Sequence, residues 1–132
     1  MTFKLGKGSA FVKSRLRRLP QSEDIWEADF LPEAEHWMGL VVEQVHGAVP
    51  AMKMLEAVPS VNDLAHLLSD AMYRPLYDSW RRPRTIRLRD NPEWQALVRH
   101  LHELRIDVEF RDDLPAWDDA AAEYQSPVKP CD

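Results

Sequence analysis

The sequence predicts a single α+β domain in which helices pack on a mixed β-sheet of about five strands. The 132 residues suffice for one domain with its own hydrophobic core. Hydrophobic residues make up 45% of the chain and charged residues 30%, which is typical of globular proteins and not of disordered ones. The expected elements run strand, strand, strand, helix, strand, helix, strand, helix. Antiparallel strands followed by a crossover unit favour a mixed sheet.

The expected domain covers residues 21–124. Residues 1–20 are basic and show no sustained periodicity, so we expect a flexible N-terminal arm with at most a short strand or helical turn at Ala10–Leu16. Residues 125–132 contain two prolines and are expected to form a C-terminal tail. The sequence contains no internal repeat.

Three strands are expected in the first half of the domain. Ile25–Phe30 alternates apolar and acidic residues, which is the period of a half-buried strand, and Pro32 is expected to end it. Residues 33–37 can then form one helical turn. Gly39–Val45 is rich in β-branched residues, and with Ala51–Val58 it predicts a hairpin.

A helix is expected to follow Pro59. Ser60 and Asp63 have the spacing of a capping box, and apolar residues then recur at helical intervals up to Met72. Pro75 is expected to stop this helix. The chain then reaches a strand at Arg84–Arg89, where apolar and basic residues alternate.

The second half of the domain continues the alternation of helices and strands. Asn91-Pro92-Glu93 has the composition of a helix start, and the apolar stripe that follows ends near Ile106. A short strand is expected at Val108–Phe110 and a last helix at Pro115–Tyr124. A right-handed crossover would place the strand parallel to Arg84–Arg89, so that Glu109 can pair with Arg87 and Arg89.

Charge is distributed in blocks along a chain whose net charge is −5. Residues 1–18 carry +6, 19–73 carry −9, 74–89 carry +5 and 90–132 carry −7. Blocks of alternating sign can pair with each other inside the fold, or they can form separate faces that bind different partners. The sequence leaves both alternatives open.

The arginine-rich segment 74–89 is the main candidate for a binding surface. It contains six arginines and one acid, beside aromatic residues. Arginine and aromatic side chains concentrate binding energy at interfaces. The alternative is that the arginines form ion pairs within the fold or are solvated, which would contribute little binding. The predicted binding residues are Tyr77, Trp80, Arg81, Arg82, Arg84 and Arg87.

Part of the chain resembles a bacterial family of uncharacterised domains. The resemblance rests on Leu68–Asp90, on the Trp-acid segment Ile25–Asp29, and on the Leu-Pro that opens Leu114–Trp117. It includes an Ala-Met-x-x-Pro helix end and an Arg-Pro before a strand, and it covers residues 25–124. The resemblance implies one domain, but no catalytic or ligand-binding residue can be carried over from it.

The basic arm supports a second hypothesis, in which the chain binds nucleic acid. Basic arms follow phosphate backbones by releasing counterions, although a solubilising tail is the more common role. If the arm and segment 74–89 lie on one side of the fold, their fields add. The basic residues of the arm are Lys4, Lys7, Lys13, Arg15, Arg17 and Arg18.

The histidines do not predict a metal site. His100 and His102 lie two residues apart, which on a helix directs them about 200° apart. His102-Glu103 begins like a zinc-protease helix, but Ile106 stands where the second histidine is required. We therefore expect no bound metal and no cofactor.

A metal-dependent hydrolase or nuclease is the third hypothesis. It would take Asp90 or Asp107 with Glu109 as metal ligands and Arg111 as charge stabiliser, but the spacing does not demonstrate a convergent acidic cluster. Cys131, the one cysteine, has no nearby activating base. An enzyme is therefore disfavoured.

The first hypothesis is a non-enzymatic interaction module that binds a protein partner or a second copy of itself. One cysteine excludes an intrachain disulfide, and no apolar run has the roughly 18 residues that span a bilayer. The basic N-terminus lacks the apolar core of a signal peptide. We therefore expect a cytoplasmic protein without membrane contact.

Overall fold

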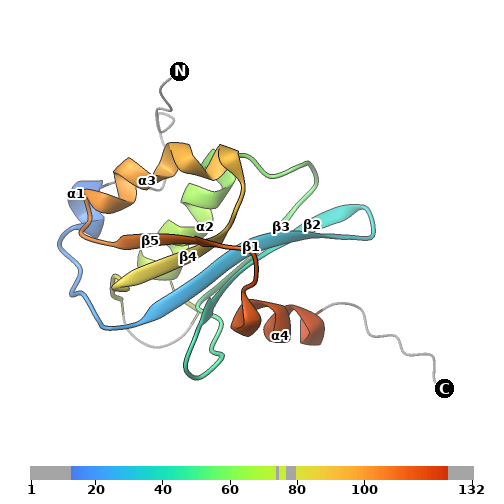
Figure 1. Cartoon of the computed structure of the whole chain (residues 1–132), viewed down its shortest axis with the longest axis horizontal. Helices are drawn as coiled ribbons and strands as arrows, with labels where there is room; N and C mark the ends of the chain where they lie inside the picture. The colour runs from blue at the N-terminus through green and yellow to red at the C-terminus, as the bar shows by residue number, and fades with distance from the viewer. Residues whose placement is uncertain (1–12, 74, 77–79, 125–132) are drawn as a thin grey trace.

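A mixed five-stranded sheet forms the centre of the molecule (Figure 1). The computed structural model describes residues 13–73, 75–76 and 80–124. The strand order is β3-β2-β1-β4-β5. β1 pairs antiparallel with β2 and parallel with β4, β2 pairs antiparallel with β3, and β4 pairs parallel with β5. The strands are β1 (Ile25–Glu33), β2 (His36–Glu43), β3 (Ala51–Leu55), β4 (Thr85–Arg89) and β5 (Asp107–Arg111).

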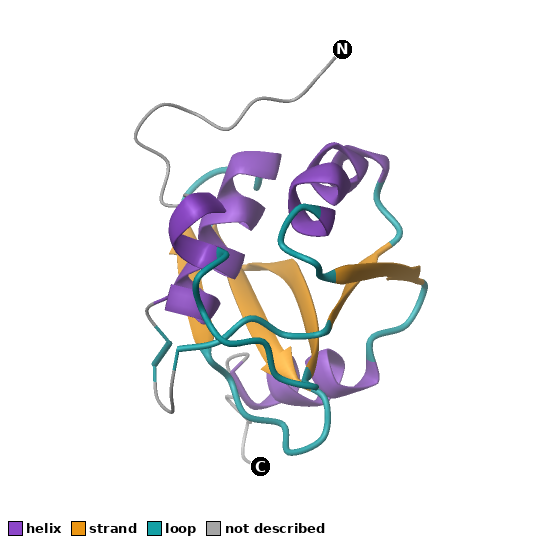
Figure 2. Cartoon of the chain, turned by 90° about the vertical axis from the view of Figure 1, so that its left-hand side faces the viewer, coloured by secondary structure: helices purple, strands orange, loops and turns teal. Residues whose placement is uncertain are grey.

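Helices cover both faces of the sheet (Figure 2). The first three α-helices lie on one face and the last lies on the other, so the expected α+β architecture and element order are confirmed. In the part of the chain that the structure describes, no helix is both long and apolar enough to cross a membrane. The helices are α1 (Lys13–Leu16), α2 (Val61–Tyr73), the 3-10 helix η1 (Pro92–Trp94), α3 (Gln95–His102) and α4 (Pro115–Tyr124).

Local signals placed the helix starts correctly. The backbone N–H and the hydroxyl of Ser60 donate to Asp63 Oδ2 over 2.8 and 3.0 Å, and Asp63 N–H donates back to Ser60 Oγ, which completes the expected capping box. Asn91 Oδ1 accepts the N–H of Glu93 and caps η1. The expected apolar stripe ends near Ile106, but α3 already ends at His102. Arg105 then adopts a positive φ of 64°, which is not helical.

The prediction that Pro32 ends β1 is wrong. Pro32 lies opposite Trp37 inside the β1–β2 ladder, and residues 34–35 form a hairpin turn in which Ala34 has φ 57°. The expected helical turn at 33–37 is therefore also wrong. Pairing between β1 and β4 stops at Ala28, so this part of β1 is a free edge, where a proline without an N–H is tolerated.

The N-terminal segment joins the domain earlier than the sequence indicated. Leu16 and Leu19 are buried in the core that α2 and α3 form against the sheet. Residues 13–20, which we expected to belong to the arm, therefore pack on the domain. Residues 1–12 of the arm and 125–132 of the tail lie outside the described residues.

Gly39 on β2 is packed closely against Phe30 of β1 and Leu67 of α2. A Cβ atom at this position would lie 2.5 Å from Phe30 Cε2 and 3.2 Å from Leu67 Cδ2. Gly39→Ala is expected to lower the free energy of unfolding by about 2–3 kcal/mol because the ring of Phe30 must move within a packed core. Urea denaturation measures this loss.

Gly47→Ala is the matched control for that substitution. Gly47 has φ 73°, and a Cβ atom at this position would have no neighbour within 4 Å, so only backbone strain opposes alanine there. We expect a loss of about 1 kcal/mol. Equal losses of unfolding free energy in the two variants would show that close packing at Gly39 adds nothing to the cost of a Cβ atom there.

Candidate functional site

The structure distributes the predicted binding residues over different environments. Residues 80–84 lie where the chain enters β4, at the amino end of the parallel strands. Arg87 lies on β4 and belongs to the sheet face that α4 partly covers. Tyr77 lies outside the described residues. The five described residues among them therefore do not form one face.

Arg81 is used within the fold. Its Nε donates to Asp24 Oδ2 over 2.6 Å, and its guanidinium lies 5.9 Å from the centroid of the Trp26 ring. Only 16% of the Arg81 side chain and 24% of the Asp24 side chain are exposed. This ion pair therefore holds the start of β1 against the segment that leads into β4.

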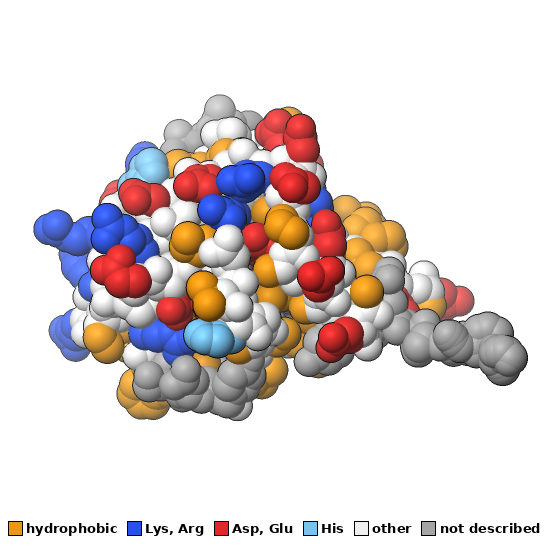
Figure 3. Space-filling view, turned by 60° about the horizontal axis from the view of Figure 1, so that its bottom comes forward, with side chains coloured by type: hydrophobic (Ala, Val, Ile, Leu, Met, Phe, Trp, Pro, Cys, Tyr) orange, Lys and Arg blue, Asp and Glu red, His pale blue; other side chains and the backbone are white. Residues whose placement is uncertain are grey.

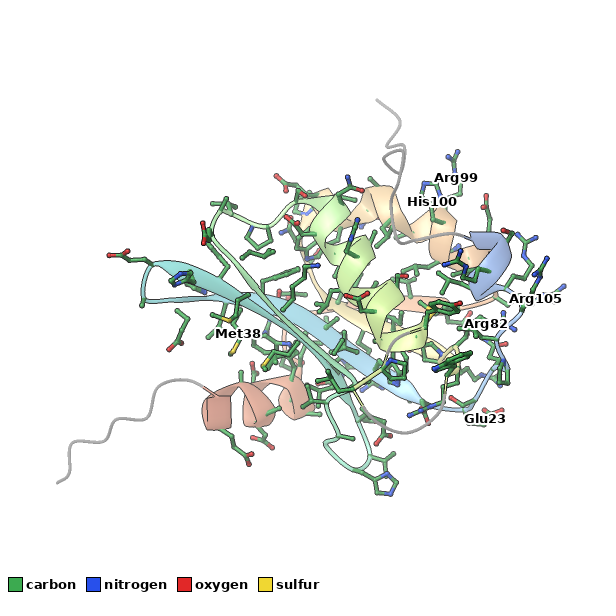
Figure 4. All side chains as sticks on the ribbon, turned by 180° about the vertical axis from the view of Figure 1, so that it is seen from behind. Glu23, Met38, Arg82, Arg99, His100 and Arg105 are labelled. Atoms are coloured by element: carbon green, nitrogen blue, oxygen red, sulfur yellow. The ribbon has the colours of Figure 1, made fainter. Side chains whose placement is uncertain are left out.

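Arg82 ties together three parts of the chain. Its Nε donates to the carbonyl of Leu19 over 3.0 Å and its Nη1 to the carbonyl of Leu104 over 2.6 Å. Burial lowers the pKa of Arg82, and the charges of Arg105 and Arg17 lower it further. Three arginines from separate segments therefore meet at this end of the molecule, where Figure 4 shows Arg82 and Arg105 beside α1.

Arg87 belongs to a charged network on the sheet. Its Nε donates to Glu109 Oε1 over 3.0 Å, as the sequence predicted, and its Nη1 lies 3.6 Å from Glu27 Oε2. The side chain of Glu27 has no exposed surface, and its Oε1 accepts the backbone N–H of Trp117 over 2.9 Å. The network thus connects β1, β4, β5 and α4.

Arg89 does not share Glu109 with Arg87, in contrast to the sequence-based expectation. In the β4–β5 register Arg87 lies opposite Glu109, whereas Arg89 lies opposite Arg111. Arg89 instead pairs with Asp29 over 3.0 Å and with Asp118 over 3.1 Å, and it lies over the Trp117 ring at 5.6 Å. This cation therefore fixes the start of α4 to the central strands.

The pKa values of this cluster follow from its burial and its charges. Burial raises the pKa of Asp29 more than the hydrogen bonds of Phe30 N–H and Arg89 lower it. Burial lowers the pKa of Arg89, but hydrogen bonds and charge from Asp29 and Asp118 outweigh that effect and the net shift is upward. Asp29 is the less exposed partner, at 15% against 30%, so burial dominates there.

An aromatic patch remains exposed at the amino end of the parallel strands. The Trp80 side chain packs on Tyr73 with ring centroids 5.4 Å apart and an interplanar angle of 37°, and Arg15 lies 5.0 Å from the centroid of Tyr73. Trp80 is 56% exposed. We call Arg15, Tyr73 and Trp80 the aromatic patch. Arg17, Arg18 and Arg105 are exposed close by in the fold.

Arg84 contributes an exposed ion pair at the amino end of β4, the end of the parallel strands that also carries the aromatic patch. Its Nη1 donates to Glu23 Oε1 over 3.2 Å, with 59% and 86% of the two side chains exposed. Exposed pairs of this kind contribute about 0–1 kcal/mol. Arg84 is therefore accessible to a partner. Figure 3 shows basic side chains gathered at the left-hand end, with acidic side chains among them and over the rest of the visible face.

The proposed nuclease residues do not converge. Asp90 follows the carboxyl end of β4, whereas Asp107 opens the parallel strand β5 at its amino end. Glu109 is paired with Arg87 and lies 3.6 Å from Arg111. Over the described ranges, no group of three or more histidine, cysteine or acidic side chains could hold a metal ion.

The sequence did not indicate that Glu27 and Asp29 on β1 pair with arginines, or that Arg105 lies near Arg82. A signal was present, because Glu27 and Asp29 alternate on β1 with the same period as Arg87 and Arg89 on β4. Whether two strands are neighbours, however, depends on long-range topology. The pairing of β1 with β4 supplied that information.

Comparison with known proteins identifies a family and a fold. The family described as "Domain of unknown function (DUF6930)" matches residues 13–125. No curated protein matches the chain. The catalytic core domain of BIV integrase has a similar structure, with a TM-score of 0.58 and 13% identity over 77% of this chain and 64% of that domain. This chain thus spans slightly less than two thirds of that domain.

Two further similar structures are those of the HTLV-2 integrase catalytic core domain in complex with magnesium. The trimeric form has a TM-score of 0.53 and 16% identity over 80% of this chain and 67% of the other. The dimeric form has a TM-score of 0.53 and 15% identity over 80% and 68%. At these identities the likeness establishes a shared fold alone.

Arg82→Ala tests whether this arginine acts as a structural clamp. Two partly buried carbonyls would lose a charged donor, so the free energy of unfolding is expected to fall by about 2–3 kcal/mol. Arg84→Ala, which removes an exposed pair, should cost at most about 0.5 kcal/mol. Urea denaturation of both variants measures the difference, and equal losses would contradict the clamp.

Asp29→Asn tests the buried carboxyl through the pH dependence of stability. The pKa of Asp29 is raised above its ordinary value of 3.8. In the pH window between the ordinary pKa and the raised one, the folded protein therefore binds more protons than the unfolded chain. The free energy of unfolding therefore decreases as pH rises through the window. The variant should lose this part of the slope in urea denaturation measured from below pH 3.8 upward. An unchanged slope would contradict the assignment.

Proposed function

The chain belongs to the DUF6930 family, a family of unknown function, and within it we propose a non-enzymatic interaction module that binds an acidic segment of a protein partner. The observation that carries this proposal is the exposed Trp80 of the aromatic patch. The partner is another protein or, in the self-association form of the proposal, a second copy of the chain. Arg15 and Arg84 would contact its carboxylates.

Trp80 differs from the other tryptophans of the chain. Trp26, Trp94 and Trp117 are buried at 0–4% exposure and Trp37 is partly buried, whereas Trp80 is 56% exposed. It is nevertheless held in place by its contact with Tyr73. A large aromatic side chain that is exposed and preordered loses little conformational entropy on binding, which is a property of interface anchors.

The charges around the aromatic patch support an acidic partner. Arg15 lies on Tyr73, and Arg17, Arg18 and Arg105 are exposed at the same end of the fold. Arg81 and Arg82 were among the predicted binding residues, but their guanidinium groups are engaged within the fold. We therefore assign recognition to the exposed arginines and give Arg81 and Arg82 the task of shaping the surface.

Nucleic acid is the second candidate partner, and one observation favours it. Residues 1–12 carry Lys4 and Lys7 and lead directly into α1, which lies at the basic end with Arg17 and Arg105. The arm and the exposed arginines therefore start from one side of the fold, so their fields add. Bases could also stack on Trp80.

A metal-dependent nuclease is the weakest of the three functions. Its support is the fold shared with integrase catalytic core domains, two of which were determined with magnesium. In this chain Arg89 lies between the carboxylates of Asp29 and Asp118, so a guanidinium already neutralises that acidic pair. The described residues hold no three-ligand acidic group. The shared fold alone does not carry catalysis.

Trp80→Ala and Arg15→Glu test the proposed function. The probes are a fluorescein-labelled peptide of glutamates interspersed with leucine and phenylalanine, and a labelled oligothymidine. Fluorescence anisotropy should show peptide binding that each substitution weakens by at least about tenfold, or about 1.4 kcal/mol. Arg111→Glu makes the same charge change at the carboxyl end of β5, away from the aromatic patch, and should leave peptide affinity within about twofold.

The two probes separate the candidate partners. Binding to oligothymidine alone, with a steep loss of affinity as salt rises, would replace the protein partner with nucleic acid. If the chain binds neither probe and is a monomer in light scattering, both the protein-partner proposal and the nucleic-acid proposal are overturned. Circular dichroism confirms that each variant is folded.

A further inference from the structure

A groove runs between α4 and the loop that joins β2 to β3. Its volume is about 780 Å³, within the range of about 300–1,000 Å³ found for pockets that hold ligands. Its apolar rims are Val45, which is 72% exposed, and Leu76, which is 61% exposed, and Ala116 lines the side of α4. Exposed apolar side chains that face a groove favour an occupant.

Two acidic residues give this groove a charge. Asp119 and Glu123 line it and lie one turn apart on α4, and both are exposed. Neither forms an ion pair with another described residue, whereas the neighbouring Asp118 is paired with Arg89. The occupant that fits is therefore an apolar segment with positive charges.

The N-terminal arm has this composition. Residues 1–12 contain two lysines and no acid, and the sequence Phe3-Lys4-Leu5 alternates apolar and basic side chains. In an extended segment, alternate side chains point to opposite sides. Phe3 and Leu5 can therefore contact the apolar rims while Lys4, on the opposite side, reaches the acidic residues of α4. Lys7 stands between Gly6 and Gly8, whose backbone freedom lets it turn to the same side as Lys4.

The path from the domain to the groove is short enough for the arm of the same chain. The described chain starts at Lys13, and Arg15, two residues later, lies on Tyr73 at the end of α2. Three residues beyond Tyr73, Leu76 lies on the rim of the groove, where its N–H donates to the carbonyl of Pro50. Twelve extended residues span up to about 40 Å.

We infer that the groove between α4 and residues 44–49 binds residues 1–12 of the same chain. The arm then covers Val45 and Leu76, and its lysines neutralise Asp119 and Glu123. This docking is independent of the aromatic patch, because it uses other residues. It would leave the arm unavailable to nucleic acid while it is bound.

Disulfide trapping in the full chain tests the inference. In a Cys131→Ser background, Leu5→Cys is combined with Val45→Cys at the groove or with Val58→Cys as control. Val45 and Val58 are both 72% exposed, so their reactivities as cysteines are matched. Under mild oxidation the Leu5–Val45 pair should form an intrachain disulfide at least about tenfold faster than the Leu5–Val58 pair.

Charge reversal tests the role of the acidic residues. Asp119→Lys with Glu123→Lys should slow trapping of the Leu5–Val45 pair to the rate of the Leu5–Val58 control. Glu35→Lys with Glu56→Lys makes the same change in net charge at exposed sites that do not line the groove, and should leave the rate unchanged.

Three results would overturn the inference. Equal trapping of the two cysteine pairs would show that the arm does not prefer the groove. A disulfide-linked dimer on non-reducing electrophoresis would assign the groove to the arm of a second copy. Trapping that is insensitive to Asp119→Lys with Glu123→Lys would remove the charge complementarity on which the inference rests.

Discussion

The buried carboxylate of Glu27 is the constraint on which the rest of the structure depends. It lies on the central strand with no exposed surface, and an unpaired charge in that position would be strongly destabilising. Arg87 on β4 supplies the opposite charge, and the N–H of Trp117 supplies a hydrogen bond. Because Arg87 also pairs with Glu109, one buried charge fixes the positions of β4, β5 and α4 around β1.

This constraint explains why an acidic chain contains an arginine-rich segment. The basic block 74–89 lies between two acidic blocks in the sequence, and in the fold β4 lies between β1 and β5. Arg81 pairs with Asp24, which directly precedes β1, and Arg89 pairs with Asp29 of β1. Arg82 donates to the carbonyls of Leu19 and Leu104. Most of the described arginines of this block therefore stabilise the fold, and the accessible positive charge comes largely from other segments.

The surfaces left over by this network are the ones available for function. The aromatic patch lies at the amino end of the parallel strands, and the acidic groove lies beside α4. The fold is similar to that of integrase catalytic core domains, and in this chain Arg89 pairs with both Asp29 and Asp118. A shared fold alone does not determine function, so the exposed surfaces of this chain are the places to test.

The sequence by itself determined the order of the elements, the helix caps and the inward faces of the helices, because these depend on neighbours within a few residues. It also predicted the pair Arg87–Glu109, since a crossover helix places β5 beside β4. Only the tertiary structure decided that Arg89 pairs with Asp29, that Pro32 continues β1, and that Leu16 and Leu19 join the core. These outcomes depend on which distant segments become neighbours, and such contacts leave no local period in the sequence.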